Sequence, residues 1–304
     1  MRYAIFDSDT ASDDAIALLT SAKFFRLIAV TIVAGNVDFD QQVRNAIFTL
    51  DYFGYDEIPV YQGARRPIMG KWEYAKEVHG ENGMGEIQEV NVKRSASIGF
   101  APDVILEMAE RYSGELEIFA VSPLTNIALA YLKDQRLPKK IKKLWIMGGA
   151  FSRGNASPIA EYNFWVDPEA ASLVLNAGFD ITIVPWETCE LGATVDDSFW
   201  NEISSLKTKA SEFFVKVNSK MRNYSKRKGQ KGSVQTDTLT VAVAYNPNLI
   251  LESIRGKVEV ETCSMSRGAM LVDYYGLEGK EPNATVVSRI DGQAFREFLL
   301  DVLS

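Results

Sequence analysis

The first apolar run of the chain and the acidic turn after it constrain the fold more than any other stretch. The run ends in Asp7 and Asp9, and after a turn of small residues Asp13 and Asp14 open a segment with helical apolar spacing. This pattern predicts a buried strand, a tight loop and a helix with Ser12 as its N-cap. Open α/β sheets bind ligands at the carboxyl ends of their strands, so four carboxylates are expected to gather at a ligand site.

These carboxylates favour a bound cation. So many negative charges in a small space repel one another unless a positive charge lies among them, and ligands made only of oxygen suit Ca²⁺ or Mg²⁺. Each acid also has an ordinary explanation, because helix dipoles favour acids in the first turn and Asp7 and Asp9 are common turn formers. An EF-hand loop is excluded, since Ser12 and Leu18 stand where that loop needs Gly and Glu.

Composition narrows the class of protein. A hydrophobic content of 46% over 304 residues is ample for a large core, and without a linker or repeat we expect a single domain, 1–304. The net charge of −7 argues against a nucleic-acid-binding surface. No apolar run has the length of a membrane span, and no signal peptide is visible. Cys189 and Cys263 lack a CxxC pattern, which indicates free thiols and a cytoplasmic location, although one disulfide between them stays open.

Strands and helices alternate along the first two thirds of the chain. Apolar strands are predicted at 3–7, 27–34, 58–62, 116–121, 144–147 and 180–187, with helical patterns between most of them. This order predicts right-handed βαβ units and a doubly wound α/β fold with a mostly parallel central sheet flanked by helices. Residues 65–85 are expected to form a loop that holds the only histidine, His79.

The pattern changes after about residue 195 to a mainly helical region. A long amphipathic helix is predicted around 206–221, followed by a basic, glycine-containing segment at 222–232 that is typical of a mobile flap. A helix at 239–245, short strands at 257–262, 270–274 and 284–288, and a closing helix from about 292 complete the chain.

Polar residues recur at the ends of the predicted strands. They are Asp7, Asp9, Asn36, Ser122, the segment from Asn155 to Asn163, and Glu187. A parallel sheet brings these ends to one edge, where they can line one pocket. Carboxylates and amides without Lys or Arg suit a neutral ligand rich in hydroxyl groups, and no phosphate-binding motif occurs. Carboxylates around a cation, with amides around a sugar, predict hydrolysis at a sugar carbon.

The chain resembles the nucleoside hydrolases, the inosine–uridine-preferring family. The resemblance rests on motifs that follow in order over nearly the whole chain: Asp7-Ser-Asp9-Thr-Ala-Ser-Asp13-Asp14-Ala, Val33-Ala-Gly-Asn36-Val, His79-Gly-x-x-Gly-Met-Gly85, Ser122-Pro-Leu-Thr-Asn-Ile-Ala128, Met147-Gly-Gly-Ala, Gly154-Asn155, Ala160-Glu161-Tyr-Asn163-Phe-Trp-Val-Asp167, and Arg267-Gly268 with Asp273. Any one motif is weak, and the series is specific.

The resemblance implies hydrolysis of a ribonucleoside to free base and ribose, as in salvage or catabolism of nucleosides. It assigns Ca²⁺ to the side chains of Asp9, Asp14 and Asp237 and the backbone carbonyl of Val121. It makes Asp9 the general base that takes a proton from the attacking water. It assigns the ribose to Asp13, Asn36, Asn155, Glu161, Asn163 and Asp237. It also implies a homodimer or homotetramer.

The chain departs from the family at one position. Many members place a histidine just before the late aspartate, where it protonates the departing base, and here that position is Thr236. A hydroxyl is too weak an acid for that step, so His79 is a candidate on the leaving-group side. Stacking of the base on an aromatic ring is another route, with Trp72, Tyr74, Trp186 and Tyr224 as candidates. This departure favours purine nucleosides slightly, with a pyrimidine-preferring enzyme as the alternative.

Two further hypotheses compete with hydrolysis. A haloacid-dehalogenase-type phosphatase uses Asp-x-Asp-x-Thr after its first strand, but here Thr10 directly follows Asp9 and Ala11 takes the required place. A non-catalytic nucleoside- or ribose-binding protein would keep the pocket and lose the chemistry, and Thr236 gives this hypothesis some support. A binder would retain the nucleoside intact, whereas a hydrolase releases reducing sugar.

Overall fold

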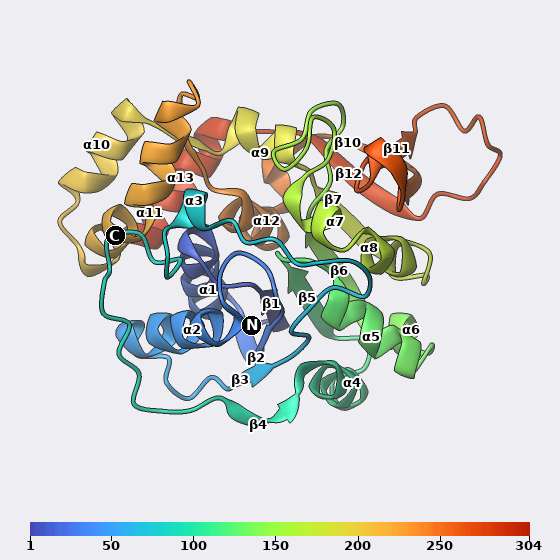
Figure 1. The fold of residues 1–304 in the computed structure, drawn as a ribbon, viewed down its shortest axis with the longest axis horizontal. Helices are drawn as coiled ribbons and strands as arrows, with labels where there is room; N and C mark the ends of the chain where they lie inside the picture. The colour runs from blue at the N-terminus through green and yellow to red at the C-terminus, as the bar shows by residue number, and fades with distance from the viewer.

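A computed structural model describes residues 1–304, and its centre is one ten-stranded sheet (Figure 1). From β4 at one edge to β12, every pair of neighbouring strands is parallel. Beyond β12, β10 pairs antiparallel with β12, and β11 pairs antiparallel with β10 at the other edge. The strands, in spatial order, are β11 (Met270–Asp273), β10 (Ile250–Val260), β12 (Ala284–Ile290), β7 (Ile181–Val184), β6 (Ile141–Met147), β5 (Leu116–Ala120), β1 (Tyr3–Ser8), β2 (Arg26–Ile32), β3 (Val60–Gln62) and β4 (Ser97–Phe100).

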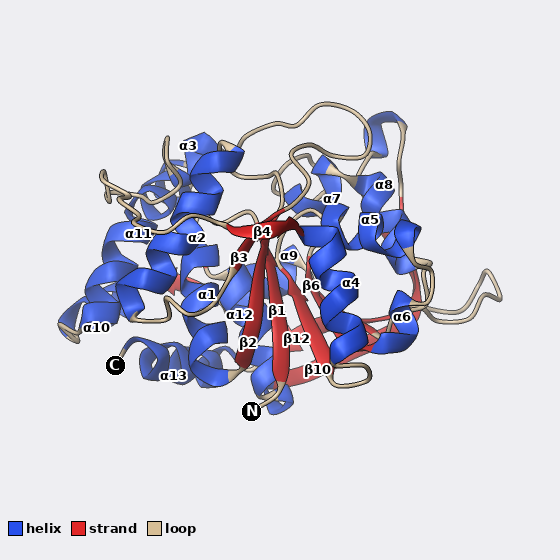
Figure 2. Cartoon of the chain, turned by 90° about the horizontal axis from the view of Figure 1, so that it is seen from below, coloured by secondary structure: helices blue, strands red, loops and turns tan.

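Helices cover both faces of this sheet, as Figure 2 shows from the side. One face packs against α1 (Ser12–Phe24), α2 (Phe39–Phe53), α9 (Trp186–Gly192), α10 (Asp197–Ser205), α11 (Lys209–Arg227), α12 (Thr236–Tyr245) and α13 (Gly292–Leu303). The other packs against α4 (Ala101–Arg111), α5 (Thr125–Lys133), α6 (Leu137–Lys140), α7 (Tyr162–Val166) and α8 (Pro168–Leu175). The predicted doubly wound α/β fold is therefore confirmed.

The alternation of side chains along β1 explains the two layers. Ala4 and Phe6 belong to the core under α1, whereas Ile5 belongs to the core under α4 and α5. Both neighbours of β1 are parallel strands, so each of its faces is covered and all three side chains are fully buried. A central strand of this kind places the residues at its carboxyl end deep inside the molecule.

Several local expectations are wrong. Ser12 is the first residue of α1 rather than its cap, and the Asp14 carboxylate accepts the N–H of Ala11 instead. The expected loop at 65–85 contains a short helix, α3 (Lys76–His79), and the predicted flap begins as the last turns of α11. At the start of these turns Arg222 pairs with Asp197 and lies over the ring of Trp200.

The C-terminal third is not a separate helical layer. Its strands β10 and β12 extend the central sheet, and β12 lies between β7 and β10. A small hairpin of β8 (Thr194–Asp196) and β9 (Gly232–Val234) and two short 3₁₀ helices, Pro247–Leu249 and Ser264–Ser266, complete the fold. No helix combines the length and the apolar character that a membrane crossing requires.

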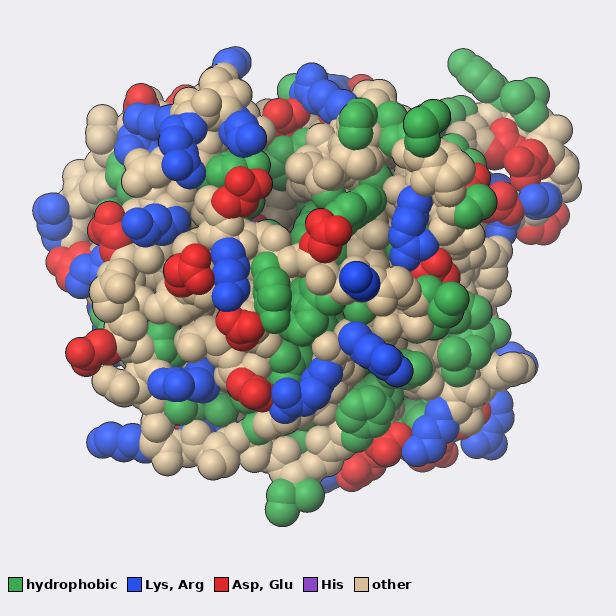
Figure 3. Space-filling model, in the orientation of Figure 1, with side chains coloured by type: hydrophobic (Ala, Val, Ile, Leu, Met, Phe, Trp, Pro, Cys, Tyr) green, Lys and Arg blue, Asp and Glu red, His purple; other side chains and the backbone are tan.

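Surface charge and thiols agree with the composition. Acidic and basic side chains are interspersed over most of the face in Figure 3, without one large basic field. Cys189 is buried in the core and Cys263 is exposed, and both are free thiols.

Asp7 links the first strand to its neighbours without entering the cavity described below. Its carboxylate accepts hydrogen bonds from Thr31 on β2 (2.6 Å) and from Asn126 on α5 (2.8 Å), and Ser122 lies 3.4 Å from its second oxygen. Burial raises the pKa of Asp7 to about 6, and the hydrogen bonds from its neighbours only partly oppose this effect.

This raised pKa predicts a pH dependence of stability. Folding favours the protonated form, so its contribution is complete below about pH 4 and is lost as the pH rises through about 6. The free energy of unfolding of the calcium-free protein should fall by about 2 kcal/mol more between pH 4.5 and 8 in the wild type than in Asp7→Asn. Urea unfolding at both pH values measures this difference, and parallel changes in the two proteins would contradict it.

Candidate active site

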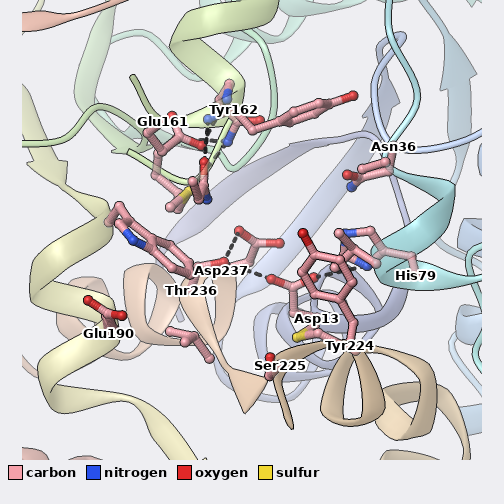
Figure 4. A pocket seen from close by; sticks show the side chains of 18 of the residues that line it. Asp13, Asn36, His79, Glu161, Tyr162, Glu190, Tyr224, Ser225, Thr236 and Asp237 are labelled. Atoms are coloured by element: carbon pink, nitrogen blue, oxygen red, sulfur yellow. Dashed lines mark hydrogen bonds and ion pairs between the residues drawn. The ribbon is translucent and has the colours of Figure 1, made fainter. Parts of the chain in front are cut away.

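A cavity of about 400 Å³ opens at the carboxyl ends of the parallel strands (Figure 4). It contains acids and amides at one end and aromatic and long polar side chains at the other. The residues of the sequence-based prediction that line it are Asp9, Asp13, Asn36, Val121, Asn155, Glu161, Asn163, Asp237, His79, Trp186 and Tyr224. Asp14 is buried just behind the lining and contacts Asn36. The structure thus brings together the residues that the family resemblance assigned to the metal and the ribose.

A group of three buried carboxylates lies at the floor of this cavity. Carboxylate oxygens of Asp13, Asp14 and Asp237 all lie within 4.8 Å of one another. The first two begin α1 and the third begins α12, so the group depends on the contact between these two helices. The resemblance assigned Asp9 rather than Asp13 to the metal, whereas the group of three carboxylates in the structure includes Asp13.

Asp9 and Asp14 are held by the surrounding backbone and side chains. One oxygen of Asp9, Oδ2, accepts the backbone N–H of Asn36 at 2.9 Å. Asp14 accepts hydrogen bonds from the Ser8 hydroxyl (2.7 Å), the Ala11 N–H (3.0 Å) and the Asn36 amide (3.2 Å). These donors fix both carboxylates at the start of α1, and Asn36 contacts both of them.

The electrostatics of the floor favour a cation. Burial, together with the charges of the neighbouring aspartates, raises the pKa of Asp9 and Asp237 well above the ordinary value and that of Asp14 to about 7. A divalent cation among them would offset both effects. The donors are oxygen atoms only, which suits a hard ion such as Ca²⁺, so the residues fit the metal that the family resemblance implies.

Thr236 and His79 lie beside the carboxylates. The Thr236 hydroxyl is 2.7 Å from Asp13 Oδ2 and 3.1 Å from Asp237 Oδ1 (Figure 4). Nδ1 of His79 is 2.5 Å from the Ser12 hydroxyl and 3.9 Å from Asp13. Burial lowers the pKa of His79, and the negative charge of Asp13 offsets this effect only in part. The imidazole is therefore neutral at pH 7.

The other wall carries Glu161 and the amides. Glu161 caps α7, where its carboxylate accepts the N–H of Asn163 at 2.8 Å and the N–H of Gly149 at 2.9 Å. Burial raises the pKa of Glu161 to about 7 in spite of these hydrogen bonds. Asn155 accepts the N–H of Tyr162 at 2.8 Å, which orients its amide along the same wall. This wall therefore presents acceptors and donors at fixed positions.

Glu187 supports this wall from outside the cavity. Its carboxylate accepts the backbone N–H groups of Phe151 (2.8 Å), Ser152 (2.6 Å) and Arg153 (2.9 Å). Burial raises the pKa of Glu187, but these donors outweigh it and the pKa lies below its ordinary value. The strand-end acids Asp7 and Glu187 thus hold neighbouring segments in place, whereas the sequence alone placed them in the pocket.

The far end of the cavity is less polar. Trp186 at the start of α9 and Tyr224 on α11 line it, together with Met221. Trp72 and Tyr74 do not line the cavity, so these two stacking candidates are wrong. Their rings pack on each other with centroids 4.8 Å apart, and the Trp72 indole donates to a backbone carbonyl.

Sequence reasoning missed several lining residues. They are Ala75, Val78, Met147, Arg153, Gly154, Tyr162, Glu190, Met221, Ser225, Lys228, Gln230 and Val234. The sequence could have indicated part of this set by helical spacing. Met221, Tyr224 and Lys228 recur every three or four residues along α11 and its C-cap, so they share one face of the helix. Glu190 likewise follows Trp186 by one helical turn, and it pairs with Arg153 at 2.5 Å.

Known proteins share this fold and sequence over nearly the whole chain. The model of the inosine-uridine preferring nucleoside hydrolase family matches residues 4–297. Uridine nucleosidase 1 of Arabidopsis thaliana is 34% identical over 275 residues, which cover 88% of this chain and 81% of the plant protein. The solved plant nucleoside hydrolase PpNRh1 has a TM-score of 0.93 at 28% identity, with 99% of this chain and 98% of that chain covered. A purine-preferring ribonucleoside hydrolase from Gardnerella vaginalis has a TM-score of 0.92 at 27% identity and the same coverage of both chains.

Fold, cavity and relatives together define an N-glycosidase that hydrolyses nucleosides. The chain belongs to the inosine-uridine preferring nucleoside hydrolase family. The predicted family, the α/β fold and the enzyme class are thereby confirmed, and the phosphatase hypothesis is wrong.

Proposed function

We propose that this nucleoside hydrolase is Ca²⁺-dependent and cleaves ribonucleosides to free base and ribose, with a slight preference for purine bases. The observation that carries the proposal is the group of buried carboxylates at the floor of a cavity whose wall bears a buried Glu and several amides. Carboxylates accept hydrogen bonds from sugar hydroxyls, and carboxamides both donate and accept them. The donor set suits a ribose next to a hard cation.

The proposed metal ligands are the side chains of Asp9, Asp14 and Asp237 and the backbone carbonyl of Val121, with Asp13 in reach of the same ion. Bound Ca²⁺ would supply Lewis acidity towards water and a positive charge that keeps the surrounding carboxylates ionised. The proposed ribose ligands, listed together, are Asp13, Asn36, Asn155, Glu161, Asn163 and Asp237.

Asp9 is the proposed general base. Because the N–H of Asn36 holds its Oδ2, the other oxygen is left to take the proton of the attacking water. The water oxygen bonds to the anomeric carbon while the bond to the base nitrogen breaks, and the base leaves with the electron pair. The transition state carries positive charge on the sugar, which Glu161 and the aspartates stabilise.

The leaving base needs a proton or an equivalent stabilisation. The Thr236 hydroxyl is too weak an acid and is directed at Asp13. We place His79 on the leaving-group side as a neutral hydrogen-bonding group, since burial lowers its pKa. Trp186 and Tyr224 would stack on the base, which makes a purine easier to protonate at its own ring nitrogen, and solvent would supply the proton. These two rings support the purine preference.

A pyrimidine-preferring enzyme is the second candidate. It is favoured by the 34% identity to an enzyme named for uridine, whereas the purine-preferring structural relative is 27% identical. The homodimer or homotetramer, the single domain and the cytoplasmic location stay predictions.

Ribose release tests the proposal directly. Inosine, adenosine, guanosine, uridine and cytidine are incubated with the wild-type enzyme, with and without prior removal of Ca²⁺, and reducing sugar is measured. We expect the enzyme to release ribose from one or more of the purine nucleosides with a higher kcat/KM than from uridine or cytidine. After removal of Ca²⁺ we expect no ribose from any of them. Higher kcat/KM for the pyrimidine nucleosides would establish the second candidate. Binding of nucleosides with no reducing sugar from any of them would indicate a non-catalytic binder.

A further inference from the structure

Thr236 occupies a central position among the carboxylates. It is the first residue of α12, it is 7% exposed, and its side chain lines the cavity. Its hydroxyl lies between Asp13 of α1 and Asp237 of α12, at 2.7 Å and 3.1 Å (Figure 4). One hydroxyl therefore connects carboxylates that are more than two hundred residues apart in the chain.

The hydrogen-bond partners of the floor carboxylates are distributed unevenly. Asp14 has three donors from the backbone and side chains around it, and Asp9 has a backbone N–H. By contrast, the Thr236 hydroxyl is the only hydrogen-bond partner of the Asp13 side chain, and likewise of the Asp237 side chain. The negative charges of these two acids repel each other. Without the Thr236 hydroxyl, neither carboxylate would have a hydrogen bond that fixes its orientation.

The hydroxyl is itself held firmly. Threonine is branched at Cβ, which leaves few side-chain rotamers at the start of a helix. The carbonyl of Thr236 accepts the Thr240 hydroxyl at 3.2 Å, and the preceding Gln235 is anchored through its N–H to Ala193 and through its amide to Asn218. All of these residues except Thr236 lie outside the cavity lining, so they can fix the hydroxyl without contacting a substrate.

We propose that Thr236 is a positioning residue that orients Asp13 and Asp237 for the metal and the ribose. This inference rests on the proposed calcium site. It gives the threonine a role of its own at the position where the sequence resemblance leads one to expect a proton donor. Groups that orient metal ligands in this way typically affect metal affinity by 10–100-fold when they are replaced.

A set of three variants tests this role. Thr236→Val removes the hydroxyl and keeps the shape, and Thr236→Ser keeps the hydroxyl. Thr238→Val is a matched control on the same helix, because Thr238 is also fully buried but its hydroxyl has no hydrogen-bond partner. The dissociation constant for Ca²⁺ is measured by competition with a fluorescent chelator, without any substrate, and circular dichroism verifies that each variant is folded.

We expect Thr236→Val to weaken Ca²⁺ binding by 10–100-fold, and Thr236→Ser and Thr238→Val to stay within about threefold of the wild type. At saturating Ca²⁺, Thr236→Val should raise KM for the nucleoside more than it lowers kcat, because Asp13 is also released. If Thr236→Val binds Ca²⁺ with the affinity of the wild type, the inference about Thr236 is wrong and the proposed calcium site is unaffected. No Ca²⁺ binding by the wild type would overturn both. If Thr236→Val does not fold, a low affinity in Thr236→Ser contradicts the inference and a wild-type affinity supports it.

Discussion

Asp9→Asn should lower kcat by roughly 10³-fold while nucleoside affinity stays within a few-fold of the wild type. An amide has no basic oxygen that can take a proton from water, and a general base of this kind typically contributes 10²–10⁴-fold. The amide oxygen can still accept the Asn36 N–H, so the local structure should persist. Single-turnover kinetics with the preferred nucleoside give kcat, and equilibrium dialysis of the inactive variant gives the affinity.

Asp7→Asn is the matched control for this experiment. Asp7 lies two residues earlier, within β1, and is equally buried, but it does not line the cavity. Its kcat should stay within a few-fold of the wild type. A loss of binding in Asp9→Asn with unchanged turnover of bound substrate would contradict the assignment of Asp9 as the base.

Removal of Ca²⁺ should produce the second large effect, on stability as well as on activity. A ligand at a thousand times its Kd stabilises the folded state by about 4 kcal/mol. In a chain of this size each kcal/mol shifts Tm by about 1.5–2 °C, so EGTA should lower Tm by about 6–8 °C at pH 8. Differential scanning calorimetry with and without EGTA measures this shift, and added Ca²⁺ should restore it.

The shift should depend on pH in a defined direction. The pKa of Asp14 is raised to about 7, so without Ca²⁺ its stabilising contribution is complete below about pH 4 and is lost as the pH rises through about 7. Protons therefore substitute for the metal at low pH, and the Tm difference should shrink from pH 8 to pH 5. Asp237→Asn should show little difference at either pH. An equal shift at pH 5 and pH 8 would contradict a metal held by these carboxylates.

Much of the fold follows from local patterns in the sequence. The apolar strand before Asp7 and the acidic start of α1 are both visible there, and strand–helix alternation indicates a parallel sheet. Parallel strands bring their carboxyl ends together, which is why Asp9, Asn36 and Glu161 could be assigned to one pocket. The family resemblance added Asp237 and Val121, which no local pattern indicates.

The features that were missed depend on contacts between distant segments. Ser12 has the chemistry of an N-cap, but its hydroxyl is turned to His79 instead. Glu187 follows a strand like the other acids, yet the backbone N–H groups of a neighbouring loop engage it outside the cavity. The hydroxyl of Thr236 could not be connected to Asp13 from the sequence, because that contact exists only once α12 packs on α1.

The packing of α12 against α1 also has a consequence for synthesis on the ribosome. A nascent chain that ends before residue 237 contains the first strands and both early aspartates of the group, but not the third. The sheet is likewise incomplete until 284–290 enter between β7 and β10. Translation must therefore be nearly finished before the three carboxylates can meet, and a prematurely terminated product lacks both the complete group and the complete sheet.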